Sequence, residues 1–228
     1  MRSKRFRSVS QQVDRSKFYT LAEAVQLVKK TSNVKFDASV ELHVHLGIDP
    51  KKAEQAVRGT VQLPHGTGQQ LRIAVFATGQ AADEATAAGA DVVGGEELIK
   101  QIKEKGVTDF DIAVAPPEMM KKLAPIAKTL GTRGLMPNPK NETVNPNPAT
   151  VVKVLRQGKV AFRSDDTGNI HQVVGRVSFD SQPLAENVTA FLDAIKRAKP
   201  AEAKGTYLAS ATLTSSMGPA VKINLSAT

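Results

Sequence analysis

Two kinds of predicted strand occur in this chain, and their order along the sequence constrains the fold more than any other feature. Between residues 33 and 48 apolar and polar side chains alternate, with Val40, Leu42, Val44 and Leu46 on one face and Ser39, Glu41, His43 and His45 on the other. This period of two predicts a strand with one buried and one solvated face. Residues 71–77 and 111–115 are continuously apolar and alternate with helical patterns, which is typical of parallel strands covered on both faces.

The alternating kind of strand is predicted at both ends of the chain. Near the start, Thr20 and Glu23 have the spacing of a capping box at the head of a helix, and the residues before about 18 are expected to be a basic leader. After residue 158 we predict a hairpin of residues 159–163 and 170–179, an amphipathic helix over residues 182–198 and a terminal hairpin of residues 207–213 and 221–223.

Two similar ends that enclose a different middle indicate that one domain is inserted into another. The predicted fold class is α/β plus α+β. Residues 1–67 and 159–228 form a split α+β sandwich domain, and residues 68–158 form an inserted three-layer α/β, Rossmann-like domain. The chain crosses between them near residues 63–68 and 157–159, where the predicted hinge residues are Gly66, Gly68 and Gly158.

The charge of the chain favours a polyanionic partner. The net charge is +9, with +6 in residues 1–67, +1 in residues 68–158 and +2 in residues 159–228. Such an excess attracts nucleic acid because each neutralised phosphate releases counterions. The chain has no cysteine, so disulfides and thiol nucleophiles are excluded, and a reducing cytoplasm is expected. No apolar run reaches the roughly 20 residues of a membrane span. The N-terminus lacks the apolar segment of a secretory signal, although an organelle transit peptide stays open.

Nothing in the sequence demands catalysis, a cofactor or a metal. Neither G-x-G-x-x-G nor G-x-x-x-x-G-K-[ST] occurs. His43 and His45 would share one strand face, but His65 and His171 are the only other histidines, so a zinc site is disfavoured. Asp165-Asp166 is more typical of a hairpin turn than of a magnesium site.

Two stretches are candidates for contact with RNA. The turn at Met217-Gly218-Pro219 carries the hydroxyls of Thr214, Ser215 and Ser216 beside a glycine that a partner can approach closely. Phe36 precedes the strand with one solvated face and offers a ring to RNA sugars or bases. An ordinary Ser/Thr-rich edge strand and core packing of Phe36 are the alternatives.

Eight segments in order carry a resemblance to a known family: residues 35–41, 46–50, 57–60, 63–66, 94–97, 131–140, 203–206 and 216–219 (KFDASVE, LGIDP, VRGT, LPHG, GGEE, GTRGLMPNPK, AKGT and SMGP). Together they resemble the family of bacterial large-subunit ribosomal protein L-one, the protein of the mobile stalk at the tRNA exit side. The match runs almost from end to end.

The resemblance implies a structural, non-enzymatic protein of the large subunit in the cytoplasm, monomeric outside the ribosome. Its partners would be large-subunit rRNA, exit-site tRNA whose release it assists, and its own mRNA, which it would repress. The implied RNA contacts are Phe36, Ser39, Glu41, Ser210, Ser216, Met217 and Gly218, with a weaker transfer at Asp165. To these we add Lys35 and Arg163 as basic residues and Thr214 as a hydroxyl beside the turn.

The chain departs from the family pattern at four positions. Ser39 and Ser216 stand where threonine is usual, which keeps the hydroxyl. Asp166 replaces a residue that is often basic, and Thr132 replaces a proline, so the role of residues 131–140 is open. Two alternatives remain at this point: a small α/β nucleotide- or ligand-binding enzyme with an incidental basic surface, and a free RNA-binding regulator that does not join ribosomes.

Overall fold

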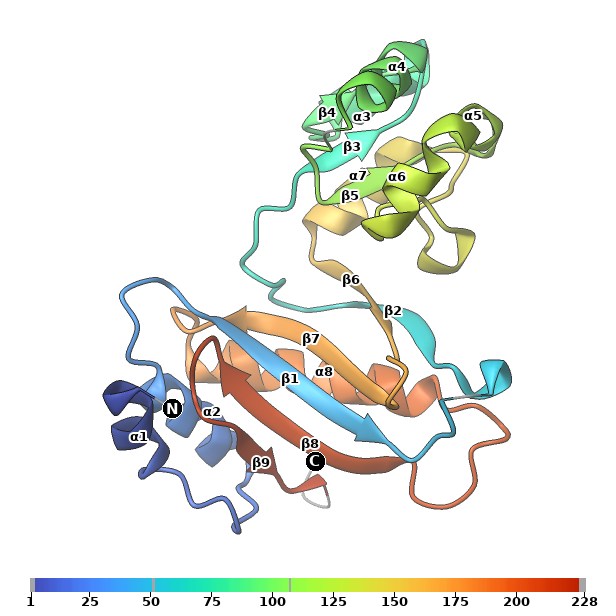
Figure 1. Ribbon diagram of the computed structural model, residues 1–228. Helices are drawn as coiled ribbons and strands as arrows, with labels where there is room; N and C mark the ends of the chain where they lie inside the picture. The colour runs from blue at the N-terminus through green and yellow to red at the C-terminus, as the bar shows by residue number, and fades with distance from the viewer. Residues whose placement is uncertain (1–2, 51, 107, 226–228) are drawn as a thin grey trace. The chain divides into compact units, whose positions relative to one another are not determined.

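The computed structural model describes residues 3–50, 52–106 and 108–225 (Figure 1). They divide into two compact units. The unit that we call the split unit runs to Gln69 and resumes at Val160, and the unit that we call the inserted unit is Gln70–Lys159. None of the described helices is long and apolar enough to cross a membrane.

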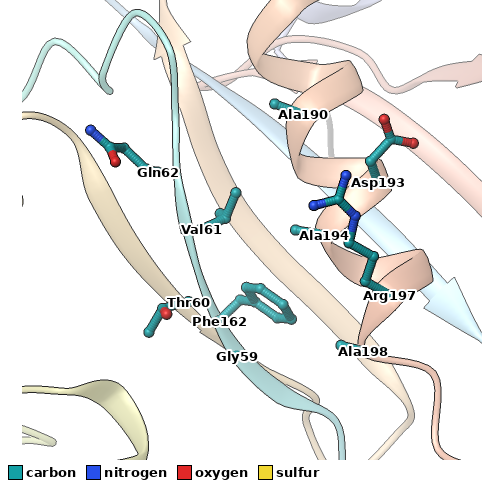
Figure 2. A pocket seen from close by; sticks show the side chains of 10 residues that line it. All are labelled: Gly59, Thr60, Val61, Gln62, Phe162, Ala190, Asp193, Ala194, Arg197 and Ala198. Atoms are coloured by element: carbon teal, nitrogen blue, oxygen red, sulfur yellow. The ribbon is translucent and has the colours of Figure 1, made fainter.

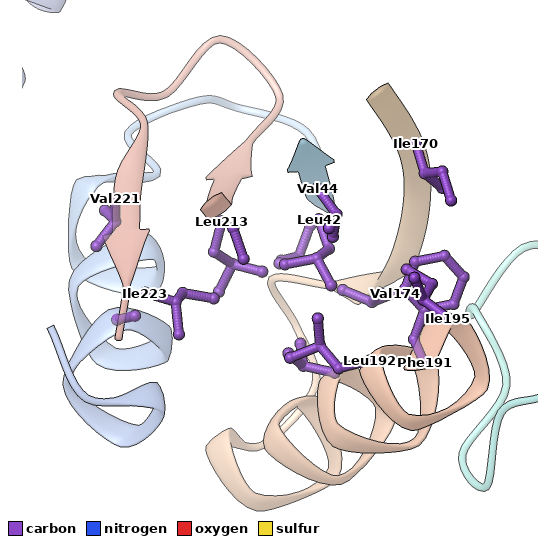
Figure 3. Packing of buried hydrophobic residues seen from close by; sticks show 14 of the residues in the cluster. Leu42, Val44, Ile170, Val174, Phe191, Leu192, Ile195, Leu213, Val221 and Ile223 are labelled. Atoms are coloured by element: carbon purple, nitrogen blue, oxygen red, sulfur yellow. The ribbon is translucent and has the colours of Figure 1, made fainter. Parts of the chain in front are cut away.

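The split unit is built on an antiparallel sheet with the strand order β7-β1-β8-β9. Its strands are β1 (Ser39–Leu46), β7 (Asn169–Arg176), β8 (Leu208–Ser215) and β9 (Val221–Ile223). One face is buried by α2 (Leu21–Thr31) and α8 (Ser181–Arg197), with the apolar side chains of β1 in the centre of the core (Figure 3). The predicted period of two in residues 39–46, the amphipathic helix and the terminal hairpin are confirmed.

One predicted hairpin is wrong. Strand β6 (Lys159–Arg163) does not pair with β7 but with β2 (Arg58–Gln62), in a separate two-stranded sheet. Phe162 on β6 packs edge-on against Phe191 of α8, with ring centroids 5.4 Å apart. At Gly59 on β2, an added Cβ would lie 2.7 Å from the Phe162 ring. The Phe162 ring thus packs directly against β2, the strand with which β6 pairs.

The start of the chain also differs from the prediction. The basic leader contains a helix, α1 (Lys4–Ser10), capped by Ser3, whose hydroxyl accepts a hydrogen bond from the Phe6 amide at 3.3 Å. Val9 and Val13 are buried, which explains why the segment folds. The predicted capping box of α2 is confirmed, because Glu23 accepts from the Thr20 amide at 3.0 Å.

The inserted unit holds a parallel sheet of order β4-β3-β5, made of β4 (Val92–Val93), β3 (Ile73–Val75) and β5 (Ile112–Val114). Ala74 and Phe76 belong to one core and Ile73 and Val75 to another, so the sheet is buried on both faces as predicted. The helices of this unit are α3 (Gln80–Ala87), α4 (Glu96–Lys105), α5 (Pro117–Lys122), α6 (Ala127–Thr132) and α7 (Pro148–Arg156). Short 3₁₀ turns occur at η1 (Ala53–Gln55) in the split unit and at η2 (Ala124–Ile126) and η3 (Pro139–Asn141) in the inserted unit.

The side chain of Asn187 on α8 fastens the segment before residue 70 to the helix by several hydrogen bonds. Asn187 is fully buried, and its amide nitrogen donates to the carbonyls of Gly66 and Val174, both at 2.8 Å. Its amide oxygen accepts from the His65 amide at 3.1 Å. Gly66, one of the predicted hinge residues, is therefore held against the core of the split unit, and Gly68 is the next glycine along the chain.

Candidate nucleic-acid interface

The face of the β7-β1-β8 sheet opposite the core carries polar side chains across three strands. In the strand register, Glu41 lies beside Thr214, His43 lies between Thr212 and His171, and His45 lies between Ser210 and Asn169. We call this set the polar face. It comprises Ser39, Glu41, His43, His45, Asn169, His171, Ser210, Thr212 and Thr214. The structure therefore brings Glu41 and Ser210, two predicted contacts from opposite ends of the chain, onto one surface.

The turn between β8 and β9 lies at the end of this face. Its backbone closes through a bond from the Gly218 amide to the Ser215 carbonyl at 2.8 Å, and Met217 has a positive φ of 60°. The amide of Ser216 donates to the carbonyl of Ser39 at 2.9 Å, which joins the turn to the start of β1. The predicted contacts Ser39, Ser216 and Met217 are therefore neighbours.

Two exposed apolar side chains stand at this end of the sheet. Met217 is 70% exposed and Phe36, three residues before β1, is 54% exposed. Core packing of Phe36 is thereby excluded. Among the described residues, Phe18 is the third large exposed hydrophobic side chain, and the Lys222 ammonium lies 5.6 Å from the centre of its ring.

Arg5 is a member of this region that sequence reasoning missed. Its guanidinium donates to the carbonyl of Asn33 and to the carbonyl of Met217, both at 3.2 Å. It thus ties α1 to the segment before β1 and to the Met217 turn. The only signal in the sequence was the positive charge of the basic leader. That charge did not indicate which arginine would bind the backbone.

The structure assigns internal roles to two predicted contacts. The Thr214 hydroxyl lies 3.1 Å from the Ser215 carbonyl and donates within the turn, which leaves its lone pairs to accept. At Gly218, an added Cβ would lie 2.3 Å from the Ser215 hydroxyl oxygen. Glycine is therefore required for the turn to close over Ser215, whatever approaches from outside.

Asp165 mainly builds the turn before β7. Its carboxylate accepts from the amides of Asn169 at 2.7 Å and Thr167 at 2.9 Å and from the Thr167 hydroxyl at 2.8 Å. These bonds, led by the Asn169 amide, hold the pKa of Asp165 far below its usual range. Asp165 is consequently an anion at neutral pH. The predicted basic contacts Lys35 and Arg163 are both exposed, in the segment before β1 and at the end of β6.

The polar face also contains a histidine pair that sequence reasoning did not find. The Nδ1 atoms of His43 and His171 are 2.8 Å apart, and the two rings meet edge-on with centroids 4.9 Å apart. The period of β1 placed His43 on the solvated face, but its partner depends on the register with β7. Within the described part of the chain, no three His, Cys, Asp or Glu side chains come together in a way that would hold a metal ion.

A groove of about 690 Å³ lies elsewhere on the split unit, between β2 and α8 (Figure 2). Small and apolar side chains line most of it, including Phe162 and Ala194, and Asp193 and Arg197 are its charged residues. None of the predicted contact residues lines it.

Comparison with known proteins defines the class. The sequence matches the family model described as the ribosomal protein L1p/L10e family over residues 28–219. This match covers most of the chain, and the chain belongs to this family. The family consists of structural ribosomal proteins, so the alternative of a small α/β enzyme is set aside.

Individual relatives are similar over nearly their whole length. The large ribosomal subunit protein uL1 of Thermobifida fusca is 51% identical over 227 residues, which cover 100% of this chain and 96% of that protein. Proteins of the same name from Salinispora tropica and Chloroflexus aggregans are 53% and 52% identical over 222 and 225 residues. These alignments cover 97% of this chain in each case, and 93% and 94% of the two relatives.

Proposed function

We propose that the chain binds large-subunit rRNA through the Met217 turn and the adjoining polar face, as a structural component of the ribosome in the cytoplasm. The observation that carries this proposal is that two exposed apolar side chains, Phe36 and Met217, lie on neighbouring segments. The hydrogen bond from the Ser216 amide to the Ser39 carbonyl joins these two segments. Isolated exposed apolar side chains are common on protein surfaces. Here they stand beside a row of hydroxyls at one end of an amphiphilic sheet.

The chemistry of this set suits the ribose face of folded RNA. Hydroxyls at Ser39, Ser210 and Ser216 can pair with 2′-hydroxyl groups, and Met217 and Phe36 can pack on sugars or bases. The Glu41 carboxylate repels phosphate but accepts hydrogen bonds from 2′-hydroxyl or guanine amino groups. Such a site selects RNA by shape, while Lys35, Arg163 and the basic α1 add attraction for phosphates that does not depend on sequence.

The two compact units are, in this proposal, the two domains of the family, and residues 68–158, whose net charge is only +1, are not expected to contribute to the rRNA contact. Motion about the crossings would let the protein assist release of deacylated tRNA from the exit site. Binding of its own mRNA, and hence repression of its own translation, would use the same surface. The protein acts as a monomer outside the ribosome.

The test is binding of the purified protein to its large-subunit rRNA stalk fragment over a series of salt concentrations. We expect Phe36→Ala and Met217→Ala each to weaken binding by about fivefold to a hundredfold, because stacking of a side chain on a base contributes about 1–3 kcal/mol. The matched control is Phe18→Ala, which removes an equally exposed ring outside the proposed site. Equal losses in all three variants, or none in any, would show that a generally basic surface binds the RNA.

Two further measurements separate the remaining roles. Co-sedimentation with large subunits distinguishes a ribosomal component from a free RNA-binding regulator. Competition between the rRNA fragment and the protein's own mRNA leader tests whether one surface serves both. Binding of both RNAs at once would contradict the shared site.

A further inference from the structure

Four side chains form a line that crosses the polar face and ends in the turn before β7: Glu41, His43, His171 and Asp165. The Nε2 atom of His43 lies 3.8 Å from a Glu41 carboxylate oxygen, and the Nε2 atom of His171 lies 3.5 Å from an Asp165 carboxylate oxygen. The two imidazoles meet through their Nδ1 atoms at 2.8 Å. All four side chains are between 31% and 53% exposed, so a partner on this face can reach them.

The Nδ1 contact limits how many protons the pair can hold. One Nδ1 must donate and the other must accept, which the neutral pair satisfies with one tautomer of each kind. When one more proton is added, the pair keeps this bond and both Nε2 atoms carry hydrogens directed at the carboxylates. A second added proton would place hydrogens on both Nδ1 atoms and break the bond. The pair therefore accepts one positive charge.

The surroundings of the pair determine when that charge is taken up. Burial of the His43 ring and the neighbouring His171 both lower the pKa of His43, while Glu41 opposes them. Strand β1 also carries His45, which is bonded to Asn169 at 2.8 Å, and β8 presents the uncharged Thr212. Without RNA, the line thus holds two carboxylates and a pair of imidazoles in which His43 is biased toward its neutral form at neutral pH.

Bound RNA changes this balance. A polyanion that settles on the polar face meets the two carboxylates, and their charge opposes its approach. Uptake of one proton by the imidazole pair reduces the charge of the line from −2 to −1 and so weakens its repulsion of the RNA. The same proton is stabilised by the phosphates, so the pair binds it more tightly in the complex than in the free protein.

We propose that the His43–His171 pair is a proton-linked RNA contact that takes up one proton when RNA binds. This inference rests on the proposed function and adds a regulation to the same surface. The linkage has a definite sign, because the pair binds a proton more tightly in the complex than in the free protein. RNA affinity therefore increases as the pH falls from the pKa of the pair in the complex to its pKa in the free protein. For a single proton the increase is at most about tenfold per pH unit.

The experiment measures RNA affinity and proton uptake together. The full-length protein is titrated calorimetrically with its rRNA stalk fragment from pH 6 to pH 8, at constant salt and in buffers of different ionisation enthalpy. We expect uptake approaching one proton per complex in the middle of this range. His43→Gln and His171→Gln each retain a hydrogen-bonding side chain, and both are expected to change the number of protons taken up while still binding the RNA.

His65→Gln is the matched control, because His65 bonds to Glu186 on α8, which covers the opposite side of the sheet. It is expected to retain the proton uptake of the wild type. Protons that the RNA itself takes up are the same for all four proteins and cancel in the comparison. Equal proton uptake by the wild type and both pair variants, or none by the wild type, would overturn the inference alone. Absence of RNA binding by the wild type would overturn the proposed function and this inference with it.

Discussion

Asn187 provides a direct test of how the segment before residue 70 is fixed. Replacing it with alanine removes three hydrogen bonds, of which the bond to the Val174 carbonyl is fully buried and the bonds to Gly66 and His65 are partly buried. A buried group left without its partner costs about 1–3 kcal/mol, and groups that water can reach cost less. We therefore expect Asn187→Ala to lower the free energy of unfolding by about 2–4 kcal/mol, a large part of the stability of a typical domain.

Tyrosine fluorescence during urea unfolding measures this loss in the split unit alone. The chain has no tryptophan, and its two tyrosines, Tyr19 and Tyr207, both belong to the split unit. Gln182→Ala is the control, because Gln182 is an exposed residue of the same helix. A loss below about 1 kcal/mol for Asn187→Ala, similar to that of the control, would refute the proposed fastening.

A second substitution at the same position tests the accepted bond and the cost of a buried charge. Asn187→Asp keeps an oxygen for the His65 amide but loses both donated bonds and buries a carboxylate. We expect Asn187→Asp to unfold at a lower urea concentration than Asn187→Ala at neutral pH. Greater stability of the aspartate variant would show that the bond accepted from the His65 amide outweighs the cost of the buried carboxylate.

Two further predictions concern the packing of the split unit. Gly59→Ala would force a methyl group against the Phe162 ring. We expect it to lower the free energy of unfolding in urea by about 1–3 kcal/mol, as overpacking usually does. An unchanged midpoint of urea unfolding would show that the two-stranded sheet of β2 and β6 can shift to make room for the methyl group. Burial raises the pKa of Tyr207 to about 12, so the folded state binds this proton more tightly than the unfolded state. The resulting stability is present below a pH of about 10 and is lost as the pH rises through 12. Because the Tyr207 hydroxyl is buried without a hydrogen-bond partner, Tyr207→Phe is expected to be neutral or stabilising at pH 7 and to remove this alkaline loss; a clear destabilisation at pH 7 would contradict this.

Periodicity in the sequence was sufficient to predict the main sheets. The alternation in residues 39–46 and the continuous apolar runs near residues 73–75 and 112–114 record which faces are buried, and burial follows directly from side-chain type. The Met217 turn was also predictable, since Gly218 and Pro219 interrupt the strand pattern. These signals come from neighbouring residues, so they can be read without knowing which strands pair.

Contacts between distant residues were not predictable from these patterns. The pairing of β6 with β2 depends on Phe162 and Phe191, which lie in separate elements, and the pairing of His43 with His171 depends on a strand register that includes an irregularity between Val40 and Glu41. One feature of the sequence did indicate that Asn187 makes buried hydrogen bonds. Asn187 is a polar residue on the apolar stripe of a helix, one position before Val188, where a side chain must find buried partners.

The central strand of the split unit has consequences for how the protein is made. β1 is synthesised early, but its two neighbours, β7 and β8, begin only at residues 169 and 208. The inserted unit is contiguous, so its own strands pair while the chain is still being elongated, whereas β1 must wait with one apolar face unpaired. A nascent chain therefore has no complete polar face until β8, which ends at Ser215, has been synthesised and has paired with β1.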